Sequence, residues 1–267
     1  MKTLFLFLSC TFLFFTSGQC QNAQNDNIYD LKSDVLYIES NYLDINIQTW
    51  EKDFIEMKSE VKINLGLGDD KHELRIDNLR EGIKITSYVD TEAIDKMVIT
   101  TDKEGNKTYT PIEDWDENKK GRGYNSLNFG YEIDGSMTLF VPENMKLNIE
   151  TTYGDVFING DYDQIETHST YGLVEAKLED VSNMNQISLK STYDIIDLTL
   201  DESSNASLNL QTSYGSVFTD LPLQINQTNN KKSSQGCSQF SERYVLNNGD
   251  TNIDIVATYD NIYVRSK

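Results

Sequence analysis

The side chains best suited to chemistry in this sequence are carboxylates at regular spacing. Four of them, Asp155, Asp163, Glu175 and Asp197, would lie near one another if segments of roughly 20 residues stack. Paired carboxylates can serve as general acid and base in polysaccharide cleavage. However, a chain with 43 acidic residues places several together by chance, and the sequence lacks G-x-S-x-G, H-E-x-x-H and a phosphate-binding glycine loop. We therefore expect no catalytic residues and keep a polysaccharide-acting enzyme as the alternative.

A second recurring feature is a tyrosine preceded by Thr or Ser and followed by Gly or Asp. It occurs at Tyr153, Tyr171, Tyr193, Tyr214 and Tyr259. The rings could stack at a corner of the fold and contribute packing, or they could form an exposed platform, spaced by about 4.8 Å, for sugar rings or an aromatic-rich partner. The constant place beside Gly or Asp favours packing, with mostly buried rings and with Tyr259 near one end of the file.

These tyrosines belong to a 12-residue pattern that predicts a strand, a corner and a second strand. Apolar residues occupy places one and ten of each copy and nearly always places three and twelve, while the even places of the first half are nearly all polar. The copies span residues 147–158, 165–176, 187–198, 208–219 and 253–264. Alternation of this kind is typical of strands with one buried face, and we expect Gly154, Gly172 and Gly215 to supply a positive φ at the corner.

Repeats of about 20 residues indicate stacked units. The predicted fold is all-β, a repetitive parallel β-solenoid of the right-handed β-helix type, spanning 137–267 with a polar insertion at 226–241. Weaker copies at 36–47 and 74–85 place a less regular β region at 33–136, which includes a long surface loop over 101–136. Antiparallel pairing is open for this N-terminal part, which would cap the exposed edge of the array.

Composition excludes several classes of function. With 43 acidic and 23 basic residues the formal charge is −20, so nucleic acid phosphates would be repelled. Only His72 and His168 are present, which rules out a Cys/His metal cluster, and no calcium-binding loop or glycine–aspartate repeat occurs. We expect no cofactor and no metal.

The N-terminus has the layout of a secretory signal peptide. Residues 1–20 contain an early lysine, an apolar run and small residues, and 21–32 read as a flexible leader. We expect an extracytoplasmic product with no transmembrane segment after signal removal. A lipid anchor at Cys20 is the alternative to a product that is periplasmic, secreted or on the cell surface. A mature chain cleaved after Cys20 keeps only Cys237, so we expect no internal disulfide.

The signal peptide, the T-Y-G-D-V type corners and the segment V-P-E-N at 141–144 resemble the bacterial putative-adhesin family of unknown function, over about residues 33–267. The resemblance implies an exported right-handed β-helix and carries no catalytic residues. The predicted function is therefore adhesin-like binding, or structural support, at the bacterial cell envelope, with a glycan or a protein as partner. A purely structural or sensory envelope module is a further alternative.

Overall fold

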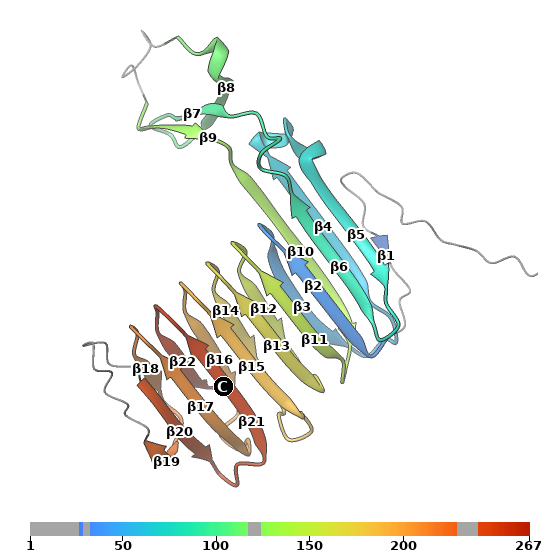
Figure 1. The fold of residues 1–267 in the computed structure, drawn as a ribbon, viewed down its shortest axis with the longest axis vertical. Coiled ribbons are helices and arrows are strands. Elements are labelled where there is room, and N and C mark those ends of the chain that lie inside the picture. The colour runs from blue at the N-terminus through green and yellow to red at the C-terminus, as the bar shows by residue number, and fades with distance from the viewer. Residues whose placement is uncertain (1–26, 29–32, 117–123, 229–239) are drawn as a thin grey trace, which may run out of the picture.

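The protein is built almost entirely from β-strands. The computed structural model describes residues 27–28, 33–116, 124–228 and 240–267 (Figure 1). Within these ranges there is no α-helix, and three short 3-10 turns occur at Asn64–Gly66, Asp69–Lys71 and Ile112–Asp114. The prediction of an all-β fold is thus confirmed. The predicted signal peptide, most of the leader and Cys237 lie outside the described residues.

Two large sheets face each other and share one apolar core. Sheet A has nine strands, in the spatial order β1 (Asn27–Ile28), β4 (Glu56–Ile63), β10 (Ile133–Pro142), β3 (Asp44–Trp50), β12 (Val156–Asn159), β14 (Val174–Lys177), β16 (Ile196–Leu200), β22 (Ile262–Ser266) and β18 (Val217–Thr219). Sheet B has ten, in the order β19 (Gln224–Thr228), β20 (Phe240–Leu246), β17 (Ala206–Thr212), β21 (Thr251–Ala257), β15 (Gln186–Ser191), β13 (Gln164–Ser169), β11 (Lys146–Thr151), β2 (Val35–Ser40), β6 (Ile83–Val89) and β5 (His72–Asn78).

A third, small sheet projects from one end of the two large ones (Figure 1). Sheet C joins β7 (Met97–Thr101) antiparallel to both β8 (Lys107–Pro111) and β9 (Ser126–Gly130). The prediction of a long surface loop over 101–136 was therefore wrong in part. Short strands with polar side chains, such as β8, have a hydrophobic pattern too weak to distinguish them from a loop.

The repeat pattern explains which side chains are buried. At places one, three, ten and twelve of the first copy stand Leu147, Ile149, Val156 and Ile158, each at most 2% exposed. The corresponding places are buried in the copies at 165, 187 and 253. In the copy at 208 only the inward side chains of the first strand, Leu208 and Leu210, are buried. Val217 and Thr219 are more exposed because they lie in β18, the edge strand of sheet A.

Both large sheets are mixed. The middle of each is parallel, with β11 in register between β2 and β13 and with β12 between β3 and β14. Antiparallel pairs lie at the N-terminal end of both sheets, where β4 pairs with β10 and β5 with β6. At the other end only sheet B is antiparallel, through β17, β20 and β19, whereas β18 of sheet A is parallel to β22. A wholly parallel array over 137–267 was therefore too simple a prediction, and part of the predicted insertion at 226–241 forms strands.

The weak copy at 74–85 also differs from its prediction. β5 and β6 form an antiparallel hairpin, closed by a turn in which the Leu79 amide donates to the Gly82 carbonyl at 2.8 Å. Only β6 joins the parallel run, beside β2. The tyrosine that marks a corner elsewhere is absent here, since Arg80 stands in its place.

The copies do not stack in sequence order. The last copy, β21 and β22, lies between β15–β16 on one side and β17–β18 on the other. Figure 1 accordingly shows the C-terminus inside the stack of strands rather than at its end. The copies at 187 and 208 are consecutive in the sequence but are separated in space by β21 and β22.

Candidate functional site

The corner tyrosines form one continuous stack of rings, which we call the tyrosine ladder. In spatial order it contains Tyr42, Tyr153, Tyr171, Tyr193, Tyr259 and Tyr214, with successive ring centroids 4.8 to 4.9 Å apart. The planes of neighbouring rings are nearly parallel, at interplanar angles of 4° to 7° except for 19° between Tyr42 and Tyr153. The spacing is that of neighbouring strands in a sheet.

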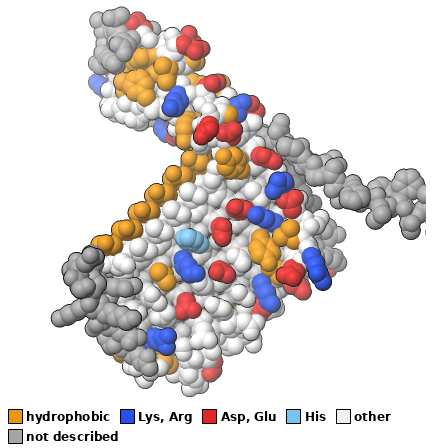
Figure 2. Space-filling model, viewed as in Figure 1, with side chains coloured by type: hydrophobic (Ala, Val, Ile, Leu, Met, Phe, Trp, Pro, Cys, Tyr) orange, Lys and Arg blue, Asp and Glu red, His pale blue; other side chains and the backbone are white. Residues whose placement is uncertain are grey.

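The ladder is more exposed than the sequence indicated. Tyr171 and Tyr193 are each 47% exposed, whereas mostly buried rings were expected. Figure 2 shows an unbroken file of hydrophobic side chains along one edge of the molecule. Because both faces of an interior ring are covered by its neighbours, the exposed parts are ring edges and phenol hydroxyls. The faces on which a sugar ring would stack are therefore occupied.

The position of Tyr259 in the ladder corrects a second expectation. It stacks on Tyr193 and on Tyr214, both at 4.9 Å, so it is an interior ring and not a terminal one. The reason is the insertion of β21 and β22 between the two preceding copies.

Sequence reasoning left Tyr42 out of the site. Its ring continues the ladder beyond Tyr153, and its hydroxyl lies 3.4 Å from that of Tyr131, near sheet C. Burial, and next the hydrogen bond with Tyr131, raises the pKa of Tyr42 to about 12. The signal was present in the weak copy at 36–47, which carries a tyrosine at the seventh place.

Close contact between successive corners, and not an unusual φ, explains the corner glycines. A Cβ on Gly172 would lie 2.1 Å from the Gly154 carbonyl oxygen, and one on Gly154 would lie 1.8 Å from that of Leu43. None of the three corner glycines has a positive φ, so that expectation was wrong. Where Asp194 and Asp260 replace glycine, the side-chain carboxylate accepts the next backbone amide at 2.7 Å.

A buried hydroxyl two residues before the tyrosine fixes the corner in the copies at 147, 165, 187 and 208, whereas Ala257 stands at this place in the copy at 253. Ser169 Oγ accepts the Gly172 amide at 3.0 Å and Thr212 Oγ1 accepts that of Gly215 at 2.9 Å. Thr151 and Ser191 act in the same way. These hydroxyls are less than 6% exposed, and the recurring Ser or Thr at place five was a signal that sequence reasoning did not use.

The four carboxylates considered for catalysis are engaged in structural contacts. Asp155 Oδ1 accepts the Leu173 amide at 2.8 Å, and Asp163 contacts Lys146 at 3.5 Å as well as the Asn185 amide. Glu175 and Asp197 are directly opposite in neighbouring strands.

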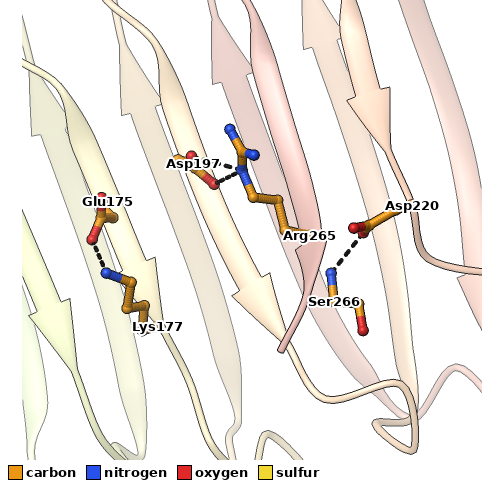
Figure 3. Close-up of polar contacts among 6 residues, drawn as sticks. All are labelled: Glu175, Lys177, Asp197, Asp220, Arg265 and Ser266. Atoms are coloured by element: carbon orange, nitrogen blue, oxygen red, sulfur yellow. Dashed lines mark hydrogen bonds and ion pairs between the residues drawn. The ribbon is translucent and has the colours of Figure 1, made fainter.

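Each of these two carboxylates forms an ion pair with a different basic side chain (Figure 3). Lys177 Nζ lies 2.5 Å from Glu175 Oε1, and Arg265 Nε donates a hydrogen bond shared by both carboxylate oxygens of Asp197, each at 2.9 Å. Both carboxylates are thus held in ion pairs on the outer face of sheet A.

The outer face of sheet A carries a few apolar side chains. Phe218 stacks on Tyr263 at 5.2 Å, and the Arg265 guanidinium lies 4.8 Å from the Tyr263 ring. Phe157 and Ile195 are partly buried on this face. These residues form a small mixed patch rather than one continuous apolar surface.

Within the part of the chain that the structure describes, no group of three or more His, Cys, Asp or Glu side chains could hold a metal ion. His72 is buried against Ser87, with Nε2 2.9 Å from the hydroxyl, and burial lowers its pKa. His168 is exposed. Among the same described residues, none forms a helix long and apolar enough to cross a membrane.

Comparison with solved structures finds a similar fold. A crystal structure from Clostridium sporogenes, described as a putative cell adhesion protein, matches with a TM-score of 0.53 over 94% of this chain and 100% of that one, at 9% sequence identity. A putative adhesin from Bacteroides fragilis matches over 90% of this chain and 95% of its own, also at 9% identity, but its TM-score of 0.24 is too low to bear on the fold. No family model and no curated protein matches the chain.

Proposed function

We propose that the chain is an exported, non-enzymatic, adhesin-like protein that binds a partner at the bacterial cell envelope along the tyrosine ladder. The observation that carries the proposal is the ladder itself, six stacked rings of which five are 47% to 61% exposed. Large aromatic side chains contribute strongly to protein interfaces because they bury much apolar area at low entropic cost. The likeness of fold to a structure described as a cell adhesion protein supports the same function.

The surroundings of the ladder suit a binding surface. The residues preceding the rings are uncharged and only partly buried: Thr152, Thr170, Thr192, Ser213 and Thr258. An uncharged band on a protein of net charge −20 reduces the repulsion that an acidic partner would meet. The ladder therefore joins apolar ring edges to a row of hydroxyls.

The regular spacing sets the kind of partner. Ring edges that repeat every 4.8 to 4.9 Å fit a partner with a similar axial repeat, either a second stack of strands or an extended polymer. We take the parallel part of the two sheets to wind as a right-handed β-solenoid, which would keep this spacing constant along the ladder.

Binding of the fluorescently labelled protein to isolated bacterial envelopes tests the proposal. We expect the double variant Tyr171→Ala, Tyr193→Ala to bind envelopes at least tenfold more weakly, because it lacks two adjacent rings at the centre of the ladder. Tyr171→Phe with Tyr193→Phe keeps the stack and removes only the hydroxyls, so it separates hydroxyl recognition from ring packing. Tyr88→Ala removes a ring that is 52% exposed but lies outside the ladder, and it should bind like the parent.

Two results would contradict the proposal. The first is unchanged envelope binding by the double alanine variant when its circular dichroism spectrum and melting show that it is folded. The second is release of products from acidic polysaccharides by the purified protein, which would support the alternative of an enzyme.

A further inference from the structure

A polar groove lies on the outer face of sheet B, away from the tyrosine ladder. Its volume is about 480 Å³, within the range of small-molecule sites. Strands β15, β21, β17 and β20 form its floor, and β19 contributes one side. Its outward side chains are those of Gln186, Asn209, Asn226, Arg243, Asn252 and Asp254.

The groove has almost no apolar side-chain lining. Leu208 and Ile253 border it, but each is 1% exposed and its side chain belongs to the core. Tyr244 also borders it, yet its hydroxyl donates to Glu242, two residues along the same face of β20. The surface offered to a ligand therefore consists of amides, one guanidinium, one carboxylate and the hydroxyl of Ser207, which donates to the Gly249 carbonyl.

The charged groups of the groove keep free hydrogen-bonding capacity. Asn209 Nδ2 donates to Asp254 Oδ1 at 3.0 Å, which leaves the second carboxylate oxygen of Asp254 without a protein donor among the described residues. Arg243 is exposed and forms no ion pair with any residue that the structure describes. Elsewhere on this face the cations are paired, as in Lys190 with Glu166 at 4.0 Å and Lys84 with Glu39.

We infer that this groove binds a neutral saccharide. Sugar hydroxyls both donate and accept, and amide side chains offer both functions, while Arg243 supplies donors and Asp254 an acceptor. The charges of Arg243 and Asp254 cancel, and a net charge of −20 on the whole chain disfavours an anionic sugar. A peptide would bury apolar side chains, for which the groove has no apolar pocket.

The groove is assembled from residues far apart in the chain. Gln186 and Asn252 are partners in register on β15 and β21, and Asn209 and Arg243 are partners on β17 and β20. Insertion of the C-terminal strand β21 places Asp254 beside Asn209. The inference does not depend on the ladder binding a partner, because no ladder residue lines the groove.

Binding to a panel of immobilised oligosaccharides, both neutral and acidic, tests the inference, followed by titration calorimetry with the best neutral ligand. We expect binding to neutral members of the panel. Arg243→Gln and Asn252→Ala should each weaken binding at least tenfold, because each removes hydrogen bonds at a different side of the groove.

Matched controls come from the repeat itself. Gln164 and Asn148 occupy the places of Gln186 and Asn209 in other copies but lie outside the groove, so Gln164→Ala and Asn148→Ala should bind within twofold of the parent. The double variant of Tyr171 and Tyr193 should also keep its affinity for the saccharide, which separates this site from the ladder. No binding to any neutral member, binding only to acidic members, or equal affinity of the groove variants and the parent would each overturn the inference.

Discussion

Asp155 shows how one side chain connects two successive corners. Its backbone amide donates to Asp44 Oδ1 at 2.9 Å, and its own Oδ1 accepts the Leu173 amide at 2.8 Å. Burial, and after it repulsion from Asp44 and Asp194, raises the pKa of Asp155 despite the hydrogen bond from Leu173. Asn261 occupies the same place in another copy and accepts the Ser216 amide at 2.9 Å, so the role does not require a charge.

Replacing Asp155 by Asn should therefore stabilise the protein at neutral pH. The pKa of Asp155 is raised above 3.8 in the folded state, so the folded protein holds this proton more tightly than the unfolded chain. As the pH rises through the raised pKa, Asp155 ionises and the folded state becomes less stable relative to the unfolded chain. We expect Asp155→Asn to melt at a higher temperature than the parent at pH 7 and at the same temperature at pH 3. Thermal melting across this pH range is the measurement, and a lower melting temperature for the variant at pH 7 would contradict it.

Thr167 is an inward residue with an unsatisfied hydroxyl. It is 0% exposed, and Oγ1 has no hydrogen-bond partner among the described residues. The same place holds Ile149 and Leu189 in the neighbouring strands. A buried hydroxyl without a partner costs about 1–3 kcal/mol.

We therefore expect Thr167→Val to stabilise the protein by about 1 kcal/mol or more, since valine has nearly the same shape and no polar atom. Urea unfolding with an unchanged slope measures the difference. Thr152→Val, which changes a partly exposed threonine of the band beside the ladder, is the control and should alter stability by less than about 0.5 kcal/mol. A loss of stability in Thr167→Val would indicate that the hydroxyl has a partner.

At the scale of elements, the corner sets the distance between successive copies. The amide of Tyr171 donates to the Thr152 carbonyl at 2.8 Å, and that of Tyr193 donates to the Thr170 carbonyl at 2.9 Å. These bonds continue the interstrand hydrogen bonding of the sheets through the corner. The rings then stack because their backbones are held at the strand spacing.

Gly172→Ala should disturb this corner. The added Cβ would lie 2.1 Å from the backbone oxygen of Gly154, so the two copies would have to move apart. We expect a loss of about 2–3 kcal/mol, as for overpacking in a core, measured by chemical unfolding. Asp194→Gly places glycine at the same position of the next copy and should cost only about 1 kcal/mol, for the hydrogen bond it removes; an equal loss in both variants would contradict the steric explanation.

At the scale of the whole molecule, the C-terminal strands connect two parts of the stack. β21 lies between β15 and β17 in sheet B, and β22 lies between β16 and β18 in sheet A. Strands β17 to β20 therefore reach the rest of both sheets through β21 and β22. The stability of this end of the stack therefore depends on β21 and β22.

Ending the chain after Asp250 should thus expose β17 to β20 and not merely shorten the stack. We expect the truncated chain to be cleaved by protease within 206–219 and 240–246 at least tenfold faster than the parent, whereas 147–200 stays protected. Limited proteolysis with mass spectrometry is the measurement. Equal protection of 206–219 and 240–246 in both chains would show that β17 to β20 can pack directly on β15 and β16.

The sequence alone determined the repeating unit. Alternation of apolar and polar residues identifies strands because one face of each is buried, and the tyrosine before Gly or Asp marked each corner. These features depend on neighbouring residues, and they sufficed to predict an all-β fold, the inward residues of the copy at 147 and the common position of the corner rings.

Only the tertiary structure decided which copies are neighbours. Copies with the same apolar places can pair in register with one another, so their pattern contains no information on the order in which they stack. The insertion of β21 and β22, the interior place of Tyr259 and the groove that joins Asn209 to Asp254 all follow from that order. The β5–β6 hairpin and sheet C were likewise decided by long-range pairing, because short strands with few apolar residues do not specify their partners locally.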